Sequence, residues 1–279
     1  MVIVAASDQH LGYDKADKPA FHKFLDQIDD DPSVTHLVLL GDVVDMWRRD
    51  ASGVFLENRD TFDKIASLQK KIHVHYVAGN HDFHVNKLKG NHYPFNFIHD
   101  DCKGINDSAP VNDCLLLSED GRNYRFVHGH QFDHQQFEPW MEALCRTMSD
   151  TVGDFESGIW AMLTRDWTDL HYFLSKFFEK RSIRKNIEGL QEKPEKRLAN
   201  TLDAIEREAC SHVKKGEILV FGHTHHPFIN KNESVVNTGS WVKDALEVDY
   251  SYNTYVRLEA TGPKLFVLDK GEITERIPC

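Results

Sequence analysis

The chain has 279 residues, 41% of them hydrophobic and 28% charged, and a formal net charge of −11 at pH 7. This length and composition fit a globular protein with one large domain or two small ones. The acidic balance disfavours nucleic acid as a partner, because DNA binding needs Lys and Arg on the phosphates. Five cysteines without a CxxC pair predict neither a disulfide framework nor a zinc knuckle.

The N-terminus gives no sign of a targeting segment. It begins Met1-Val2-Ile3-Val4 and has no basic stretch before the apolar run, unlike a signal peptide. No apolar stretch approaches the roughly 20 residues that span a bilayer. We therefore expect a cytoplasmic protein.

The first third of the chain alternates between strand and helix patterns. Apolar runs predict strands over 2–6, 36–40 and 72–78, and apolar residues at helical spacing predict helices over 19–30 and 57–70. This order predicts a parallel sheet with right-handed crossovers. In such sheets, sites form outside the carboxyl ends of the strands.

The remainder mixes a hairpin, a helical stretch and further short strands. Residues 114–118 and 123–128 predict a hairpin, and residues 131–216 read as mostly helical. The strand pattern resumes at 218–221. Three further runs predict a second, largely antiparallel sheet, around 234–238, 252–258 and 264–268.

Five short polar motifs stand just after strand-like runs. They are Asp8-Gln9-His10, Gly41-Asp42-Val43-Val44-Asp45, Gly79-Asn80-His81-Asp82, His128-Gly129-His130 and Gly222-His223-Thr224-His225. Asp and His suit Mn²⁺, Zn²⁺ or Fe, and two metals that share a carboxylate need about seven protein ligands. The candidate ligands are Asp8, His10, Asp42, Asn80, His128, His223 and His225, with Asp42 as the bridge.

Such a metal pair predicts phosphoryl chemistry. Two ions about 3.5–4 Å apart can hold a hydroxide between them and polarise a phosphoryl group for in-line attack. His81 would then face the leaving oxygen or an equatorial phosphoryl oxygen, and Asp82 would fix its tautomer and favour its protonated form. Each motif alone is compatible with an ordinary turn or loop, so the hypothesis depends on all five occurring in order.

The ordered set resembles the calcineurin-like metallophosphoesterase superfamily over about residues 1–130 and 217–241. The resemblance implies an α/β fold, a four-layer αββα sandwich of two mixed sheets in a single domain over 1–279. It also implies two divalent metal ions, with Mn²⁺ favoured and Fe, Zn²⁺ or Mg²⁺ as alternatives.

The same resemblance implies a role for each motif residue. One metal would be bound by Asp8, His10, Asp42 and His225, and the other by Asp42, Asn80, His128 and His223. His81 matches the catalytic histidine and Asp82 its partner, while Asp45 would lie behind the ligands. His130 is the alternative to His128, because both lie in one His-Gly-His motif.

The helical insertion over 131–216 resembles a lid found in the UDP-2,3-diacylglucosamine hydrolase-like branch. The phrases Gly-Asn-His-Asp-Phe and Asn237-Thr238-Gly239-Ser240-Trp241 echo that branch. That branch has Arg where this chain has His81, so a general phosphomonoesterase or phosphodiesterase is equally supported. A repair-type Mn-dependent nuclease and a non-catalytic scaffold of the same fold are the remaining alternatives.

Two patterns within the insertion bear on the substrate. Apolar residues over 170–178 fall at helical spacing, which favours a stripe facing the core over a lid that lines an apolar pocket. Lys180, Arg181 and Arg184 either form a solvated face or contact a phosphate, an anionic lipid or a membrane surface. We expect a small phosphorylated substrate linked to a nucleotide, sugar or lipid.

Overall fold

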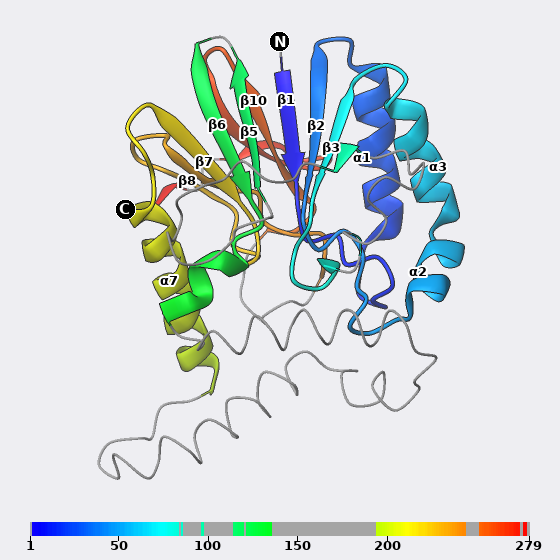
Figure 1. The fold of residues 1–279 in the computed structure, drawn as a ribbon, viewed down its shortest axis with the longest axis horizontal. Helices are drawn as coiled ribbons and strands as arrows, with labels where there is room; N and C mark the ends of the chain where they lie inside the picture. Colours follow the sequence, from blue (N-terminus) through cyan, green and yellow to red (C-terminus); the bar gives the residue numbers. More distant parts are fainter. Residues whose placement is uncertain are drawn as a thin grey trace.

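The computed structural model describes residues 2–83, 85, 96–97, 114–119, 121–135, 194–243, 251–273 and 276–277. Within them, two β-sheets lie face to face and helices cover both outer faces (Figure 1). The chain therefore forms the predicted αββα sandwich.

Seven strands form the first sheet, in the order β12-β11-β10-β1-β2-β3-β4. They are β1 (Val2–Ala6), β2 (Val34–Leu40), β3 (His73–Val77), β4 (Asn96–Phe97), β10 (Thr254–Glu259), β11 (Gly262–Val267) and β12 (Gly271–Ile273). Strands β1, β2 and β3 run parallel, as the sequence predicts, and the short strand β4 continues the parallel order. The strands β10, β11 and β12 extend the sheet on the antiparallel side of β1.

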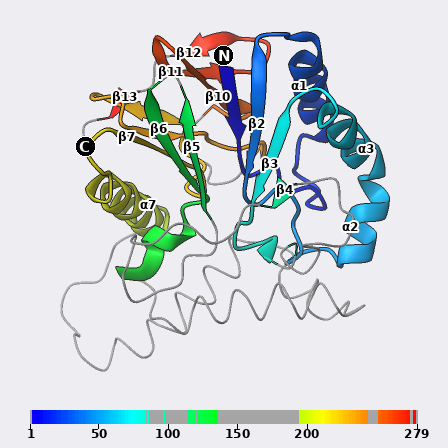
Figure 2. The same ribbon diagram turned by 45° about the horizontal axis from the view of Figure 1, so that its top comes forward.

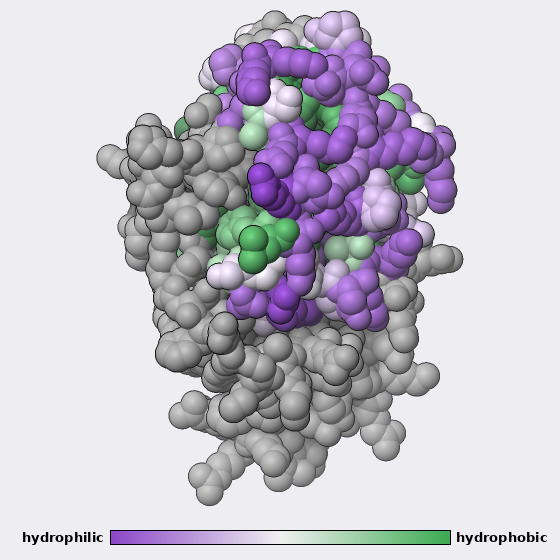
Figure 3. Space-filling view, turned by 90° about the vertical axis from the view of Figure 1, so that its right-hand side faces the viewer, coloured by the Kyte–Doolittle hydropathy of each residue, from purple (hydrophilic) through white to green (hydrophobic). Residues whose placement is uncertain are grey.

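Three helices cover the outer face of this sheet: α1 (Lys18–Asp30), α2 (Ala51–Glu57) and α3 (Arg59–Leu68). Helix α1 begins where the Asp17 carboxylate accepts a hydrogen bond from the Ala20 amide at 3.3 Å. Its buried side chains Phe21, Phe24 and Leu25 pack into the core beneath the sheet. The opposite face of these helices is mostly hydrophilic, with a small apolar patch (Figure 3).

Six strands form the second sheet, in the order β13-β8-β9-β7-β6-β5. They are β5 (Cys114–Glu119), β6 (Arg122–Val127), β7 (Glu217–Phe221), β8 (Phe228–Asn230), β9 (Val235–Asn237) and β13 (Arg276–Ile277). The pairs β5–β6 and β8–β9 are antiparallel, whereas β6–β7, β7–β9 and β13–β8 are parallel.

The two mixed sheets implied by the family resemblance are confirmed, but the largely antiparallel second sheet predicted from the strand pattern is wrong in two respects. The sheet is mixed, and the strands expected around 252–258 and 264–268 belong to the first sheet as β10 and β11. The sequence marks the β10–β11 hairpin through its turn. It does not show which edge the hairpin joins, because burial of Val256, Leu258 and Leu265 between the sheets is compatible with either.

Helix α7 (Pro194–Ser211) covers the outer face of the second sheet (Figure 1). Its Ile205 and Ala209 pack with Phe132, Phe221 and other residues of one buried cluster. The 3₁₀ helix η2 (His130–Gln135) lies against α7. The two ends of the predicted insertion thus belong to the outer layer of the sandwich, and residues 136–193 lie outside the described residues.

The layers place the motif loops at one end of the molecule. Strands β1, β2 and β3 of the first sheet and β6 of the second lead toward the same edge (Figure 2). Between the sheets, a core that includes Ile3, Val38, Val77 and Phe126 holds the strands in register. No helix in the described part of the chain is both long and apolar enough to cross a membrane.

Candidate metal centre

The strand ends bring the five motifs into direct contact. The backbone amide of Asp8, after β1, donates to the carbonyl of Gly41, after β2, at 3.0 Å. In the second sheet the amide of Gly222, after β7, donates to the carbonyl of His128, after β6, at 2.8 Å. The amide of His223 then donates to Asp8 Oδ2 at 2.9 Å, so the two sheets are linked at the site itself.

Five of the predicted ligands adopt the left-handed backbone conformation that non-glycine residues seldom use. The φ angles are 57° at Asp8, 46° at His10, 52° at Asp42, 68° at His223 and 58° at His225. Such strain persists only where the surrounding structure enforces it, and it gathers at functional sites. Asp8 and His10, two residues apart, thereby enter one ligand group, whereas His223 and His225, also two apart, enter different groups.

The motif glycines make room for the ligands. A Cβ at Gly79 would lie 2.2 Å from Asp42 Oδ1, and one at Gly222 would lie 2.5 Å from Asp8 Oδ2. At Gly41, where φ is +80°, a Cβ would lie 2.4 Å from His128 Nδ1. The three glycines are therefore required by close approach of backbone to ligand.

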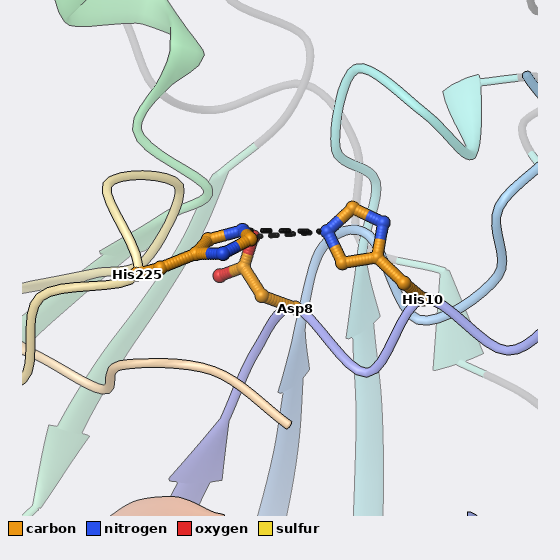
Figure 4. A group of neighbouring side chains, drawn as sticks. All are labelled: Asp8, His10 and His225. Atoms are coloured by element: carbon orange, nitrogen blue, oxygen red, sulfur yellow. Dashed lines mark hydrogen bonds and ion pairs between the residues drawn. The ribbon is translucent and has the colours of Figure 1, made fainter. Parts of the chain in front are cut away.

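Asp8, His10 and His225 form the first group of candidate ligands, whose ligand atoms all lie within 4.8 Å of one another. Figure 4 shows the Asp8 carboxylate between the rings of His10 and His225. Asp8 Oδ1 is 3.2 Å from His225 Nε2 and 3.7 Å from His10 Nε2. This oxygen is buried and accepts no hydrogen bond.

Asp42, His128 and His223 form the second group. His128 Nε2 lies 3.2 Å from Asp42 Oδ2 and 3.1 Å from Asn80 Oδ1. The other ring nitrogen of His128 lies 3.0 Å from the Leu40 carbonyl oxygen. Nδ1–H donates to that oxygen, so Nε2 faces Asp42 and Asn80.

Asp42 lies between the two groups. His10 Nε2 of the first group is 3.8 Å from Asp42 Oδ2, the same oxygen that faces His128. This position matches the predicted bridge. His130 belongs to neither group within the described residues, and its ring centroid lies 5.6 Å from that of His128. The geometry therefore favours His128 over His130 as the ligand.

The carboxylates and imidazoles of the centre shift one another's pKa. Burial alone would lower the pKa of His10, but Asp45 and Asp8 raise it to about 9. Burial acts against the charged form of His128 as well, yet Asp42 and Asp8 raise its pKa to about 10. The centre thus attracts positive charge strongly.

The residues present fit a pair of divalent ions. A buried carboxylate oxygen without a hydrogen bond, with His225 Nε2 at 3.2 Å and His10 Nε2 at 3.7 Å, is a costly arrangement unless a cation lies among these atoms. The donor set of carboxylate, amide and imidazole suits Mn²⁺, Fe or Zn²⁺. Bound ions would replace the protons that His10 and His128 otherwise hold.

Asp45 orients two histidines from behind the ligands. Its carboxylate lies 3.2 Å from Nδ1 of His10 and 3.2 Å from Nδ1 of His81. Both rings therefore direct Nε2 toward the centre. Burial would raise the pKa of Asp45, but the charges of Arg48 and His81 hold it well below its usual range.

The predicted role of Asp82 as partner of His81 is wrong. Its carboxylate accepts hydrogen bonds from the Tyr76 hydroxyl at 2.6 Å and from the amides of Gly79 and Val43 at 2.6 and 2.8 Å. Asp82 thus fastens the loop after β3 to the loop after β2. Asp82 directly follows His81 in the sequence, but its carboxylate contacts these three groups, whereas Nδ1 of His81 faces Asp45.

Trp47 and Arg48 also contribute to the site, although the motifs do not single them out. The Trp47 ring stacks on His81 with centroids 4.0 Å apart. Arg48 pairs with Asp45 and lies 4.3 Å from the centre of the Tyr13 ring. In the sequence, the only sign that Trp47 and Arg48 belong to the site is that they follow Asp45 by two and three residues.

Glu206 on helix α7 supports the site as well, although no motif in the sequence singles it out. It is buried, accepts a hydrogen bond from the Thr224 hydroxyl at 3.0 Å and lies 3.1 Å from His226 Nδ1. Thr224 and His226 alternate with the ligands His223 and His225. Glu206 therefore holds this loop through the two residues that alternate with the candidate ligands.

The segment from Asn237 to Trp241 supports the same loop. The Asn237 amide donates to the Gly222 carbonyl at 3.0 Å and to the Thr224 hydroxyl at 2.9 Å. The amide of Trp241 donates to the Asp8 carbonyl at 3.0 Å. This segment therefore stabilises the backbone around the candidate metal centre. The predicted substrate residues Lys180, Arg181 and Arg184, and the apolar stripe over 170–178, lie outside the described residues.

Comparisons with solved structures give several similar folds. A single mutant of Vps29 from Entamoeba histolytica is 16% identical, with 97% of this chain and 94% of that chain covered and a TM-score of 0.42. A conserved protein from Streptococcus pneumoniae described as a predicted phosphoesterase is 14% identical, with coverages of 98% and 92% and a TM-score of 0.36. A dimetal phosphatase from Danio rerio is 14% identical, with coverages of 98% and 96% and a TM-score of 0.41.

Similarity at this level supports no conclusion about activity, and no curated protein matches the chain. The family model described as calcineurin-like phosphoesterase matches residues 1–227, more than half of the chain. All ten residues to which the sequence resemblance gave a role lie within this range. The chain therefore belongs to the calcineurin-like phosphoesterase family.

Proposed function

We propose that this chain hydrolyses a phosphomonoester, phosphodiester or pyrophosphate bond in a small substrate, with two divalent metal ions in the centre described above. The observation that carries the proposal is the convergence of two ligand groups, Asp8-His10-His225 and Asp42-His128-His223, on the strand ends of both sheets. Family membership supports a metal-dependent phosphoesterase at the coarser level. Mn²⁺ is the favoured ion, since its preference for carboxylate suits Asp8 and Asp42.

Each metal would have three ligands of its own and would share a fourth. Asp8, His10 and His225 would hold one ion and Asn80, His128 and His223 the other, with Asp42 shared. When bound, such a pair activates water and polarises the phosphoryl group. The remaining steps depend on other side chains around the centre.

His81 is the proposed catalytic residue, because its Nε2 faces the centre 4.0 Å from Asp42 Oδ2. Burial lowers the pKa of His81, so the free enzyme holds the ring neutral near neutral pH. An anionic phosphoryl group beside Nε2 would raise that pKa and favour the protonated ring. Asp45 fixes Nδ1 and Trp47 fixes the plane, so the proton is held where a leaving oxygen can take it.

The test is a substrate panel assayed with Mn²⁺, covering p-nitrophenyl mono- and diesters, nucleotides and UDP-sugars. We expect turnover of at least one class, lost on chelation and restored by Mn²⁺. His81→Asn should keep its metal and lose roughly 10²–10⁴-fold in rate, less for p-nitrophenyl esters, whose leaving group needs no proton. Loss of metal from this variant would instead make His81 a ligand.

The same panel separates the alternatives. A repair-type nuclease would degrade duplex DNA with Mn²⁺ and leave the small esters intact, although the net charge of −11 opposes DNA binding. A non-catalytic scaffold would bind metal and turn over nothing. A substrate linked to a nucleotide, sugar or lipid, and contact with an anionic lipid surface through Lys180, Arg181 and Arg184, remain further proposals, to be tested by charge reversal at these three positions.

A further inference from the structure

Two hydroxyl groups in series connect the second sheet to Asp8, the candidate ligand that comes after β1. Ser7 Oγ lies 2.5 Å from Asp8 Oδ2 and 2.5 Å from the hydroxyl oxygen of Thr238. Ser7 directly follows β1 of the first sheet, and Thr238 directly follows β9 of the second. All three side chains are fully buried. These contacts therefore cross from one sheet to the other beside the metal centre.

The direction of the two hydrogen bonds follows from what each group can donate. An ionised carboxylate only accepts, so the Ser7 hydroxyl donates its single proton to Asp8 Oδ2. Ser7 has no second proton, and the Thr238 hydroxyl therefore donates to Ser7 Oγ. The competing acceptors are farther away. The Gly239 carbonyl lies 3.1 Å from Ser7 Oγ, and the Phe221 carbonyl lies 3.4 Å from the Thr238 hydroxyl.

The two oxygens of Asp8 have different surroundings as a result. Oδ2 accepts hydrogen bonds from the Ser7 hydroxyl and from the amide of His223, the latter at 2.9 Å. Oδ1 accepts none, and it lies 3.2 Å from His225 Nε2 and 3.7 Å from His10 Nε2 (Figure 4). The protein thus satisfies Oδ2 by itself and leaves Oδ1 to a cation.

Close packing holds this arrangement in place. A Cβ at Gly222 would lie 2.1 Å from Ser7 Oγ and 2.5 Å from Asp8 Oδ2. The backbone of the ligand loop therefore packs against both partners of the Ser7–Asp8 hydrogen bond. Thr238 is fixed as well, because its amide donates to the Phe221 carbonyl at 2.9 Å. The two hydroxyl groups thus meet the carboxylate in one defined orientation.

We propose that Ser7 and Thr238 are positioning residues of the metal centre. Their hydroxyl relay, from Thr238 through Ser7 to Asp8, holds Oδ2 within the protein, so that Asp8 binds its metal ion through Oδ1 alone. This inference rests on the proposed function, since it concerns a ligand of the proposed ion pair. A ligand that supplies a single oxygen leaves positions on the ion open for water and substrate, as a catalytic metal requires.

The relay gives the segment from Asn237 to Trp241 a second role. Asn237 and Trp241 hold the backbone of the site through their hydrogen bonds to Gly222 and Asp8. Thr238 differs from them, because its hydroxyl acts through Ser7 on the side chain of a ligand. Groups that orient a ligand change metal affinity or activity by roughly 10–100-fold. Removal of either hydroxyl should therefore weaken metal binding.

The test is a titration of the metal-free, full-length protein with Mn²⁺ in the absence of substrate. Ser7→Ala and Thr238→Val each remove one hydroxyl of the relay, from opposite sheets, so the test does not depend on the folding of one variant. We expect each to bind one of the two ions roughly 10–100-fold more weakly than the wild type. Thr238→Ser keeps the hydroxyl and should bind Mn²⁺ like the wild type. Wild-type affinity in both Ser7→Ala and Thr238→Val would overturn the relay.

Thr254→Val is the matched control. Thr254 is a buried threonine beside the relay, and its hydroxyl donates to the Thr238 carbonyl at 2.7 Å rather than to a relay hydroxyl. This variant should lose melting temperature as Thr238→Val does, but keep its affinity for Mn²⁺. Equal weakening of Mn²⁺ binding in Thr254→Val or in Thr238→Ser would show that core packing causes the loss, and the proposal would be wrong.

Binding without substrate also separates this inference from the proposed function. A wild-type chain that binds two Mn²⁺ ions and hydrolyses no ester would contradict the proposed function. Weaker Mn²⁺ binding by Ser7→Ala in that same chain would still support the relay. A wild-type chain that binds no metal ion would overturn both.

Discussion

At the scale of single residues, the metal centre depends on backbone that approaches the ligands closely. Left-handed φ angles at Asp8, His10 and Asp42 turn these side chains inward, and glycines without a Cβ leave space for them. The motif spacing predicts which residues meet. It does not predict this strain, because φ is set by contacts between loops that are far apart in the sequence.

Gly79→Ala should disable the centre without touching any ligand. The new methyl group would lie 2.2 Å from Asp42 Oδ1 and 2.6 Å from the Asp42 amide nitrogen, so the bridging carboxylate must move. We expect lower metal content and at least a hundredfold loss of rate, because misplacement by about 1 Å costs that much. Gly53→Ala is the control, since its methyl group meets only the mobile end of Arg49. Equal activity of both variants would show that Asp42 tolerates displacement.

Asp45→Asn should weaken the orientation of His10 and His81 together. The two Nδ1 atoms bond to different oxygens of Asp45, and asparagine keeps only one acceptor oxygen, so one ring loses its partner. We expect a drop of roughly 10–100-fold in metal affinity or activity, as for other groups that hold a ligand in place. Metal titration and steady-state rates of the variant measure the two effects. Wild-type values for both would rule out Asp45 as the residue that orients these rings.

At the scale of elements, the sequence predicts which strands exist better than it predicts where they join. The strands β1, β2 and β3 are predicted correctly, and so is the β5–β6 hairpin, because apolar runs and turn signals are local. The β10–β11 hairpin was assigned to the wrong sheet, since edge pairing depends on distant packing. Helix α7 shows the same limit, because nothing in its sequence indicates that Glu206 reaches the ligand loop.

Glu206→Gln should test the contact between α7 and the ligand loop. It removes the charge that faces His226 and one of the oxygens available to Thr224, while keeping the size of the side chain. We expect metal affinity to fall about tenfold while the melting temperature changes little. Glu208→Gln, on the same helix but paired with His212, is the control. If both variants bind metal like the wild type, α7 acts only as packing.

At the scale of the whole molecule, the centre joins the two sheets and its charges contribute to folding. In the metal-free protein His10 and His128 have pKa values of about 9 and 10, above the value of about 6.5 expected in the unfolded chain. Groups with raised pKa stabilise the fold fully below pH 6.5, and this stabilisation is lost as pH rises toward 9 and 10. Metal ions would replace the lost protons.

The metal-free protein should therefore lose stability as the pH rises. We expect its melting temperature to fall between pH 6.5 and 9.5, while the metal-loaded protein keeps most of its stability over this range. The gap between the two melting temperatures should widen with pH. Thermal unfolding of chelator-treated and reloaded samples measures it. A gap that narrows with pH would show that His10 and His128 are not charged in the metal-free fold.

The central claim is that two metal ions share Asp42 in one centre. The most direct test is the electron paramagnetic resonance spectrum of the protein loaded with two equivalents of Mn²⁺, the favoured ion of this centre. Two ions about 3.5–4 Å apart are magnetically coupled, so we predict the multi-line spectrum of a coupled pair, lost in Asp42→Asn together with activity. Spectra of isolated Mn²⁺ ions from an active wild-type enzyme would contradict the shared centre.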